Sequence, residues 1–421
     1  MNLFSKYKKL FLVIAFLAIT FILGFLLYRT FFQSSLVLGP EPITITPTTT
    51  PGSLPISGEG TPQTGTSEPG TIPGSENIPG GTGINQQPDP NAPSDVALGG
   101  VTKTETLTSS AGLAPTLSNS GGIQYYNKDD GYFYKIDVSG NAVKMSDRVF
   151  YNVEDVTWAP NKNKAVLEYP DNTKILYNFE TKKQVTIPSH WEDFDFSPQS
   201  DQIIAKSIAL DPDNRFLTVA SDDGSRVYNI EEIGLNADKV KTGWSPNNQI
   251  VATYAESIDL NRQEVFFVGL NGENFKSTTV EGRGLVYEWS KTGDRLLYSA
   301  YNTNSNMKPL LWVVDAQGDN INKNRISLGI NTWADKCTFA TNTEVYCAVP
   351  VDLEVGSGLI RALADDNPDE LYKIDLRTGT KTLVAIPDGQ FNMENLIVNN
   401  NQSQLFFSDK NTGLIHKINL K

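Results

Sequence analysis

The chain of 421 residues has very little histidine and very little cysteine, with only two of each. A zinc site built from these side chains needs about four of them to converge, so we predict no such site and no cofactor. The sequence contains neither a G-x-x-x-x-G-K-[ST] phosphate-binding loop nor a G-x-S-x-G nucleophile elbow. Neither histidine lies near a nucleophile motif, and we therefore assign no catalytic residue.

Basic residues are also too few to balance the acidic ones. The net charge is -13 and the sequence pI is near 4.8. A surface with this charge repels phosphate backbones. The composition therefore argues against nucleic acid as a partner.

One long apolar run lies near the N-terminus, from Leu10 to Tyr28, and no charged residue interrupts it. As a helix it would rise about 28 Å, which matches the hydrocarbon core of a bilayer. Three lysines lie within residues 1–9, whereas only Arg29 follows the run closely. The positive-inside rule then predicts a cytoplasmic N-terminus and an extracytoplasmic remainder. A cleaved signal peptide is the alternative, although no A-x-A-like site follows the run.

Residues 29–100 are dominated by proline, glycine, serine and threonine. They offer few large apolar side chains, so burial cannot offset the entropy lost when the chain is ordered. We therefore predict a disordered linker over 29–100. It would join a transmembrane helix over 10–28 to a globular domain over 101–421.

The globular part contains a repeated pattern of an apolar strand, an aromatic residue, a turn such as A-P-N or S-P-N, and a second apolar strand. Seven copies align with spacings of 38 to 59 residues, and their aligned positions are Leu117, Trp158, Phe196, Trp244, Trp289, Phe339 and Val398. Such a period, with four short strands in each unit, is typical of a β-propeller. We predict an all-β, seven-bladed β-propeller, or a six-bladed one if the copy at Leu117 is disordered.

The last copy ends after its third strand, at Lys421, and lacks a fourth. The segment Val101–Leu107 precedes the first copy and has the alternating pattern of a strand. We expect it to supply the missing outer strand of the last blade. This would close the ring and hide the edges of that blade.

The turns WAPN, FSPQ and WSPN, followed by a third strand such as LYKIDLRTG, resemble the TolB-like, WD-type propeller repeats of bacterial envelope proteins. The sequence departs from the family pattern because no copy contains the full S-P-D-G turn. The resemblance implies a propeller at the cell envelope. It implies a binding role only weakly, because propellers serve mostly as interaction platforms but also as parts of enzymes.

The aligned aromatic residues occupy one equivalent position in each blade, so we expect them to pack between neighbouring sheets. The two cysteines, Cys337 and Cys347, fall on the first and second strands of one unit, with Asn342 midway between them. Antiparallel pairing about that midpoint places the two side chains opposite each other, near the geometry of a disulfide. An extracytoplasmic location would permit the bond, and two buried free thiols are the alternative.

The connections that lead from one blade to the next should surround one mouth of the central channel. They carry Tyr151, Trp191, Arg283, Trp333 and Asp335. Aromatic and polar groups around a concave mouth suit a peptide or sugar ligand, and these five residues form the predicted binding surface. Alternatively, they brace the junctions between blades.

Together these features predict a membrane-anchored, extracytoplasmic propeller that binds a protein, peptide or glycan of the cell envelope. The alternative is a carbohydrate-active enzyme that uses two carboxylates at the channel mouth. Such pairs are defined by their distance in the fold and leave no motif in the sequence.

Overall fold

The structure is a computed structural model that describes residues 20–23, 92–137 and 139–421. Residues 20–23 are helical. Within the described ranges, no helix has the length and apolar character required to cross a bilayer. The predicted membrane segment Leu10–Tyr28 lies mostly outside these ranges, as does the predicted linker up to residue 91.

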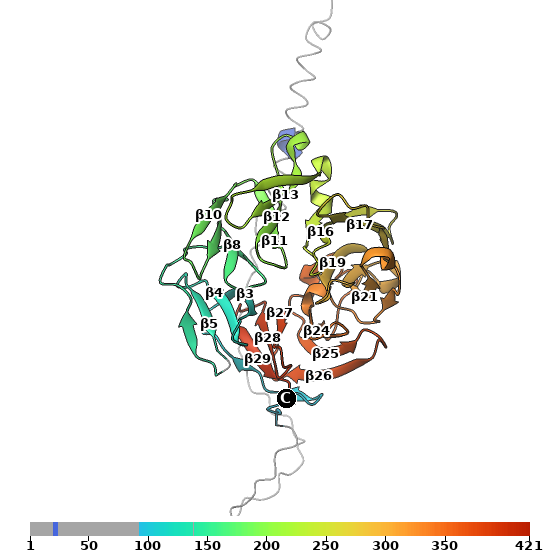
Figure 1. The fold of residues 1–421 in the computed structure, drawn as a ribbon. Helices are drawn as coiled ribbons and strands as arrows, with labels where there is room; N and C mark the ends of the chain where they lie inside the picture. Colours follow the sequence, from blue (N-terminus) through green and yellow to red (C-terminus); the bar gives the residue numbers. More distant parts are fainter. Residues whose placement is uncertain (1–19, 24–91, 138) are drawn as a thin grey trace, which may run out of the picture. The chain divides into compact units, whose positions relative to one another are not determined.

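Seven sheets are arranged around a central channel, as Figure 1 shows. The prediction of a seven-bladed propeller is confirmed. The inner strands of blades 1 to 7 are β3 (Gly112–Leu117), β7 (Asp155–Trp158), β11 (Trp191–Phe196), β15 (Val240–Thr242), β19 (Arg283–Trp289), β23 (Cys337–Phe339) and β27 (Met393–Val398). The second strands are β4 (Ile123–Asn127), β8 (Lys164–Glu168), β12 (Gln202–Ser207), β16 (Ile250–Ser257), β20 (Arg295–Tyr301), β24 (Glu344–Pro350) and β28 (Gln404–Asp409).

The third strands are β5 (Phe133–Ile136), β9 (Lys174–Asn178), β13 (Phe216–Ser221), β17 (Gln263–Gly269), β21 (Leu310–Asp315), β25 (Asp369–Asp375) and β29 (Ile415–Asn419). The outer strands of the first six blades are β6 (Ala142–Lys144), β10 (Gln184–Ile187), β14 (Val227–Glu232), β18 (Thr278–Val280), β22 (Ile326–Ser327) and β26 (Lys381–Pro387). Consecutive strands within each blade pair antiparallel.

The repeated turn between the first and second strands has a physical basis in the backbone. In blade 4 the backbone N–H of Asn248 donates to the carbonyl of Ser245 over 2.8 Å, and Asn248 adopts φ 62°. The Ser245 hydroxyl accepts from the backbone of Ile250 over 2.9 Å. Asparagine tolerates the left-handed region better than most residues do, and short polar side chains satisfy backbone groups in turns. The same left-handed position is taken by Lys162 after W-A-P-N and by Ser200 after F-S-P-Q, so the backbone geometry of the turn recurs while its residues vary.

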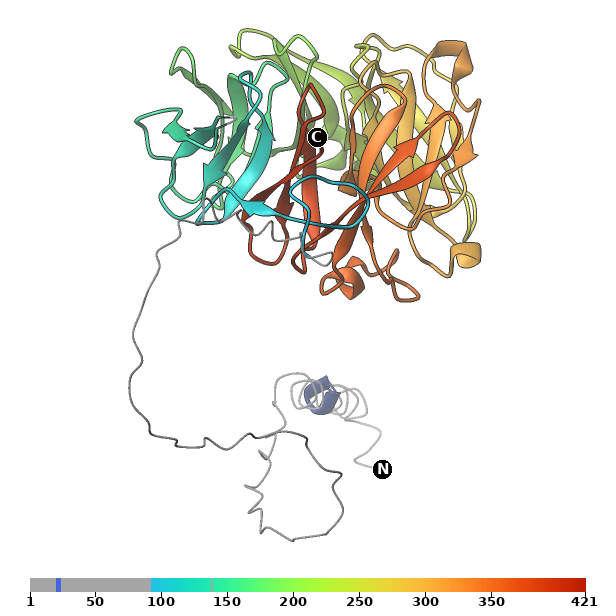
Figure 2. The ribbon, with the colours of Figure 1, turned by 90° about the horizontal axis from the view of Figure 1, so that it is seen from below.

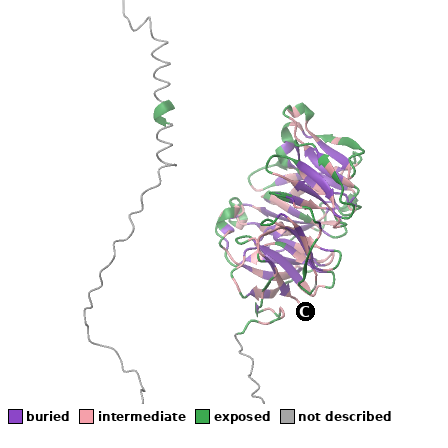
Figure 3. Cartoon of the chain, turned by 90° about the vertical axis from the view of Figure 1, so that its left-hand side faces the viewer, coloured by how far each residue is buried: buried purple, intermediate pink, exposed green. Residues whose placement is uncertain are grey.

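The core lies between neighbouring sheets rather than within any one of them. Figure 3 shows buried residues along the strands and exposed residues mainly in the connections. Between blades 1 and 2, for example, the ring of Trp158 lies 5.5 Å from that of Phe133 and 5.4 Å from that of Phe179. Burial of one such side chain stabilises the fold by about 2–3 kcal/mol.

The ring closes through the segment that precedes the first blade. Strand β2 (Glu105–Thr106) pairs antiparallel with β29 as the outer strand of blade 7, as predicted. Strand β1 (Val101–Thr102) instead pairs parallel with β26, so blade 6 has five strands. The segment therefore crosses from blade 6 to blade 7, as the cyan ribbon in Figure 2 shows. A seven-residue extended segment is long enough to reach two neighbouring blades. The alternating pattern of Val101–Leu107 predicted a strand but did not reveal that it pairs with both blades.

Hydrogen bonds to the propeller begin before the predicted boundary at residue 101. The backbone N–H of Ala97 donates to Asn419 over 2.9 Å, and that of Gly99 donates to Val384 over 2.8 Å. The last residues of the predicted linker, among them Ala97 and Gly99, are therefore part of the closure. Few apolar side chains are needed there, because the backbone itself supplies the bonds.

Cys337 and Cys347 form a disulfide bond in blade 6. They are direct cross-strand partners in the pairing of β23 with β24, which is the register expected from the turn midpoint. Both side chains are buried.

Candidate binding site at the channel and its upper face

Antiparallel strands alternate in direction, so two kinds of connection lie at the same end of every blade. These are the loops between the second and third strands and the connections from one blade to the next. We call this end the upper face. Its longest loop, residues 351–368, follows β24 in blade 6; the opposite end, the lower face, carries the turns between the first and second strands and between the third and outer strands.

Exposed large apolar side chains gather on the upper face. They are Tyr151, Leu210, Leu235, Ile258, Leu260, Val351, Val355, Leu359, Ile360 and Leu363. None of the described residues in the lower-face turns exposes a large apolar side chain to a comparable extent. Other exposed apolar side chains lie before β1, at Leu98, or on outer strands, at Val143, Val227 and Tyr228. A concentration of such side chains on one face usually marks a site of interaction.

Three of these loops join side by side into a rim, which we define as residues 258–262, 302–309 and 351–368. The backbone N–H of Thr303 donates to the side chain of Asn261 over 3.0 Å. The backbone N–H of Gly358 donates to the carbonyl of Met307 over 2.7 Å. A Cβ atom on Gly358 would lie 2.5 Å from the Cβ atom of Tyr301, so only glycine permits this approach. The rim is therefore a connected surface across blades 4 to 6.

The longest rim segment, residues 351–368, is the blade 6 insertion. Its helix η6 (Arg361–Ala364) carries Arg361, which forms two hydrogen bonds with the Asp335 carboxylate, at 2.6 Å and 3.1 Å. The guanidinium also lies 4.9 Å from the ring centroid of Trp333. Leu353 and Ala364 pack with Trp333 beneath the insertion. Trp333 is thus the floor of the insertion and not an open surface.

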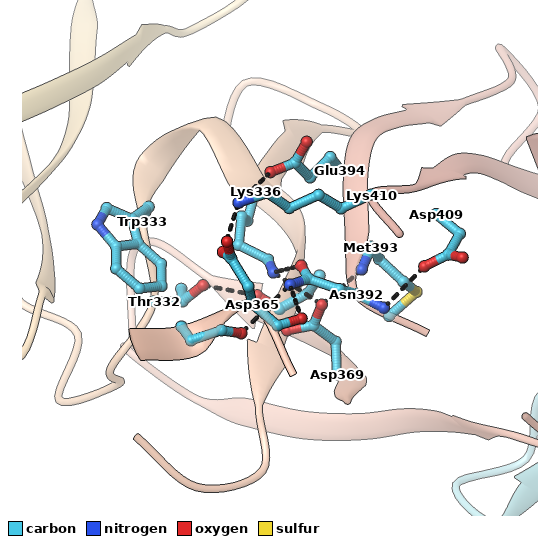
Figure 4. A network of polar contacts seen from close by, with 12 residues as sticks. Thr332, Trp333, Lys336, Asp365, Asp369, Asn392, Met393, Glu394, Asp409 and Lys410 are labelled. Atoms are coloured by element: carbon cyan, nitrogen blue, oxygen red, sulfur yellow. Dashed lines mark hydrogen bonds and ion pairs between the residues drawn. The ribbon is translucent and has the colours of Figure 1, made fainter. Parts of the chain in front are cut away.

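A buried polar network fixes the base of this insertion (Figure 4). The ammonium group of Lys336 lies 2.8 Å from Asp369 and 2.7 Å from the side-chain oxygen of Asn392. The amide nitrogen of Asn392 donates to the carbonyl of Asp365 over 3.0 Å, and Lys410 forms an ion pair with Asp365 at 2.5 Å. Burial raises the pKa of Asp369, and the charge of Lys336 opposes this shift. The network ties the insertion to blades 6 and 7.

A cavity of about 400 Å³ opens in the central channel beside this network. The inner strands of blades 5, 6, 7 and 1 line it, through Pro115, Glu288, Trp289, Lys291, Asp335, Cys337, Thr338, Phe339, Asn395, Leu396 and Ile397. Its size lies in the lower part of the range for small-ligand and peptide side-chain sites. Charged groups and aromatic rings share the walls.

The inner strands of blades 1, 3, 5 and 7 each contain a bulge, and those of the other blades do not. The bulge residues with positive φ are Ala114, Asp193, Gly284 and Asn395. A bulge redirects side chains and is common next to binding sites. In blade 7 the bulge places Asn395 in the wall of the channel cavity.

The carboxylates of the channel have perturbed pKa values. Burial raises the pKa of Glu288 to about 7; Asp335 and Asp195 add to the shift, whereas Lys241 opposes it. Burial also raises the pKa of Asp195 to about 6, against backbone hydrogen bonds from Trp244 and Phe196. Glu288 is nonetheless exposed to the channel, so its charge is available to a ligand. A cationic group would relieve the repulsion among these carboxylates.

The five predicted site residues do not form one surface. Trp333 and Asp335 meet at Arg361, and Asp335 lines the channel cavity. Trp191 is buried between blades 2 and 3, so its ring cannot stack on a ligand from solvent. Tyr151 is 74% exposed on the upper face. Arg283 donates to the Ser257 hydroxyl over 2.5 Å at the junction of blades 4 and 5.

Two residues of this site were missed in the sequence. Arg361 lies in an insertion that interrupts the repeat, and Glu288 directly precedes the aligned Trp289. The unusual length of the loop after β24 could have indicated Arg361. Nothing in the sequence marked Glu288, because its raised pKa depends on strands from other blades. Among the described residues, no group of three or more His, Cys, Asp or Glu is placed to hold a metal ion.

No protein-family model and no curated protein matches the sequence. Among solved structures, the β-propeller domain of Cps50 (Swd1) from Myceliophteria thermophila is similar at 12% identity and TM-score 0.49, over 76% of this chain and 100% of that one. An oligogalacturonate lyase from Vibrio parahaemolyticus is similar at 10% identity and TM-score 0.48, over 76% and 93%. The tricorn protease is similar at 9% identity and TM-score 0.48, over 75% and 33%. We draw no functional argument from likenesses this distant.

Proposed function

We propose that the chain is an envelope binding module, whose propeller presents its upper face to a protein, peptide or glycan outside the membrane. Residues 10–28 would anchor it, with residues 1–9 in the cytoplasm and the linker over 29–100 as a spacer. A β-propeller fold suits a protein-binding module. The resemblance of the repeats to TolB-like propellers supports the location at the envelope.

One observation carries the binding role: the exposed large apolar side chains of the loops lie on the face that also holds the channel mouth. Exposed apolar side chains lower solubility, so a surface that gathers them is expected to have a partner. The rim also presents Asp352, Glu354 and Asp366, and none of these three takes part in a salt bridge of the described residues. The rim therefore favours a partner with apolar groups bordered by positive charge.

The experiment compares three forms of the immobilised full chain in envelope extracts. They are the wild type, a rim variant (Leu359→Ser with Ile360→Ser) and a control (Val227→Ser with Tyr228→Ser on the outer strand of blade 3). We expect quantitative mass spectrometry to show partners that the wild type and the control retain and the rim variant loses. An identical retained set for all three forms would contradict the role of the rim.

The anchor is tested separately from the binding face. We expect the full chain to remain in the membrane pellet after alkaline carbonate extraction, and a membrane-impermeant lysine reagent to label the propeller in intact cells. Release into the supernatant would contradict the anchor. Labelling only after lysis would contradict the extracytoplasmic location.

A carbohydrate-active enzyme remains a second candidate because of the channel. Glu288, whose pKa is raised to about 7, shares a cavity with Asp335 and Trp289. Glycoside hydrolysis uses two carboxyl groups, one as general acid and the other as base or nucleophile. Release of reducing ends from envelope polysaccharides by the wild type, and its loss in Glu288→Gln, would favour this candidate.

A further inference from the structure

A second concave site lies away from the channel, at the periphery of the propeller between blades 3 and 4. This outer groove has a volume of about 310 Å³ and is lined by Leu217, Glu231, Glu232, Ile233, Asn236, Val240, Tyr254, Phe266 and Val268. It shares no lining residue with the channel cavity and none with the rim. An inference from it therefore stands apart from the proposed function.

The groove follows from the way flat sheets pack in a ring. The floor of the groove is the part of the interface between blades 3 and 4 where Leu217, Ile233 and Val240 are buried in one apolar cluster. Farther out the sheets diverge, so the same face of blade 4 is only partly covered. Tyr254 and Phe266 are cross-strand partners on that face, with ring centroids 5.8 Å apart, and Phe266 is 37% exposed. Two aromatic rings thus stand open over an apolar floor.

The lip of the groove is acidic. Glu231 and Glu232 end strand β14, and both are exposed. A register shift between Leu217 and Thr218 sets the pairing of this strand end. Neither glutamate takes part in a salt bridge among the described residues. The cation nearest to the aromatic rings, Lys239, lies 5.9 Å from the Tyr254 ring and is paired with Glu256 at 3.8 Å.

We propose that the outer groove binds a segment of a partner protein that inserts a large apolar side chain against Tyr254 and Phe266 and places an adjacent arginine or lysine against Glu231 and Glu232. The apolar floor excludes water and favours an aliphatic or aromatic anchor. The unpaired carboxylates supply charge complementarity, which gives specificity and fast association.

Charge also distinguishes this occupant from the other candidates. Two copies of the same acidic lip would repel each other, so a symmetric dimer through this groove does not fit. Anionic lipid would meet the same repulsion, in a protein with net charge -13. A basic, apolar peptide segment satisfies both halves of the groove.

The test is the selection of peptides from a random dodecapeptide display library on the immobilised full chain. Synthetic peptides of the selected sequences are then titrated, by fluorescence anisotropy, against the wild type, Glu231→Lys with Glu232→Lys, and Phe266→Ser. A control with the same change in charge is Asp147→Lys with Glu180→Lys, at exposed positions elsewhere. Circular dichroism checks that each variant is folded, and the charge-reversal pair removes no buried side chain.

We expect selected sequences to combine a large apolar residue with an arginine or lysine within two positions. Their affinity should fall at least tenfold in the Glu231/Glu232 variant and in Phe266→Ser, should fall with added salt, and should change less than twofold in the control. Selected peptides that lack a basic residue, or that bind the Glu231/Glu232 variant as tightly as the wild type, would overturn the proposal. A selection that yields no groove-dependent peptide would overturn it as well. Phosphatidylglycerol vesicles that displace the selected peptides from the wild type would identify lipid as the occupant instead.

Discussion

The ion pair between Lys336 and Asp369 offers the sharpest test of how the propeller holds its blade 6 insertion. The side chains of Lys336 and Asp369 are 3% and 0% exposed, and their charged atoms lie 2.8 Å apart. Replacement of Lys336 by methionine keeps the aliphatic stem and removes the charge. Asp369 is then left with the backbone N–H of Met393, at 2.6 Å, and its second oxygen has no hydrogen-bond partner.

The expected cost follows from this loss of compensation. Removal of one member of a buried pair costs about 3–5 kcal/mol, because the remaining charge is left uncompensated in the interior. The side-chain oxygen of Asn392 also loses its Lys336 donor. We therefore expect Lys336→Met to lower the free energy of unfolding by about 3–5 kcal/mol.

Urea unfolding, followed by tryptophan fluorescence, measures this change. The matched control is Lys276→Met, which breaks the exposed pair with Asp319 at 3.3 Å and should cost less than about 1 kcal/mol. The double variant Lys336→Met with Asp369→Leu removes both charges and should recover most of the loss. A cost below about 1 kcal/mol for Lys336→Met, or a double variant no more stable than the single one, would refute the reasoning.

Three further predictions concern the disulfide, the channel and the inner-strand bulge. Non-reducing mass spectrometry should find no free thiol in the native chain, and two free thiols would contradict the disulfide bond. The double variant Cys337→Ser with Cys347→Ser should lower the free energy of unfolding by about 2–3 kcal/mol, because the loop that the bond closes is short. The raised pKa of Glu288 means that the folded state holds this proton more tightly than the unfolded state does. The contribution of protonated Glu288 to the stability of the folded state is therefore present below pH 4.5 and lost as the pH rises to about 7. The variant Glu288→Gln should remove this part of the pH dependence of the urea unfolding midpoint. Gly284→Ala should destabilise the propeller by about 1–3 kcal/mol in the same assay, because φ is 65° and a Cβ atom would lie 2.4 Å from the Tyr301 ring; an unchanged midpoint would contradict this.

Much of the fold could be predicted from the chain because each blade is encoded locally. The apolar strands, the S-P-N turn and the aromatic residue after the first strand all lie within one repeat of sequence. The register of Cys337 with Cys347 was equally local, since only a short turn separates them. The double use of Val101–Leu107 by two blades was not predicted, because alternation identifies a strand but not its partner.

The candidate site was less predictable, for a reason that particular residues make clear. Trp191 and Trp333 are both buried, Trp191 between blades 2 and 3 and Trp333 beneath residues of the blade 6 insertion. Asp335 reaches the channel cavity, but its partner Arg361 comes from an insertion that breaks the repeat. The identity of a residue in a connection does not say which way its side chain points.

The sequence by itself determined the seven blades, the closure of the ring by the segment before the first blade, and the acidic character of the protein, because these depend on periodicity, chain order and composition. Only the tertiary structure decided which side chains are open to a ligand. The raised pKa of Glu288, the paired rings of Tyr254 and Phe266, and the continuous rim all arise where different blades meet. Contacts between blades depend on distances that no single repeat encodes.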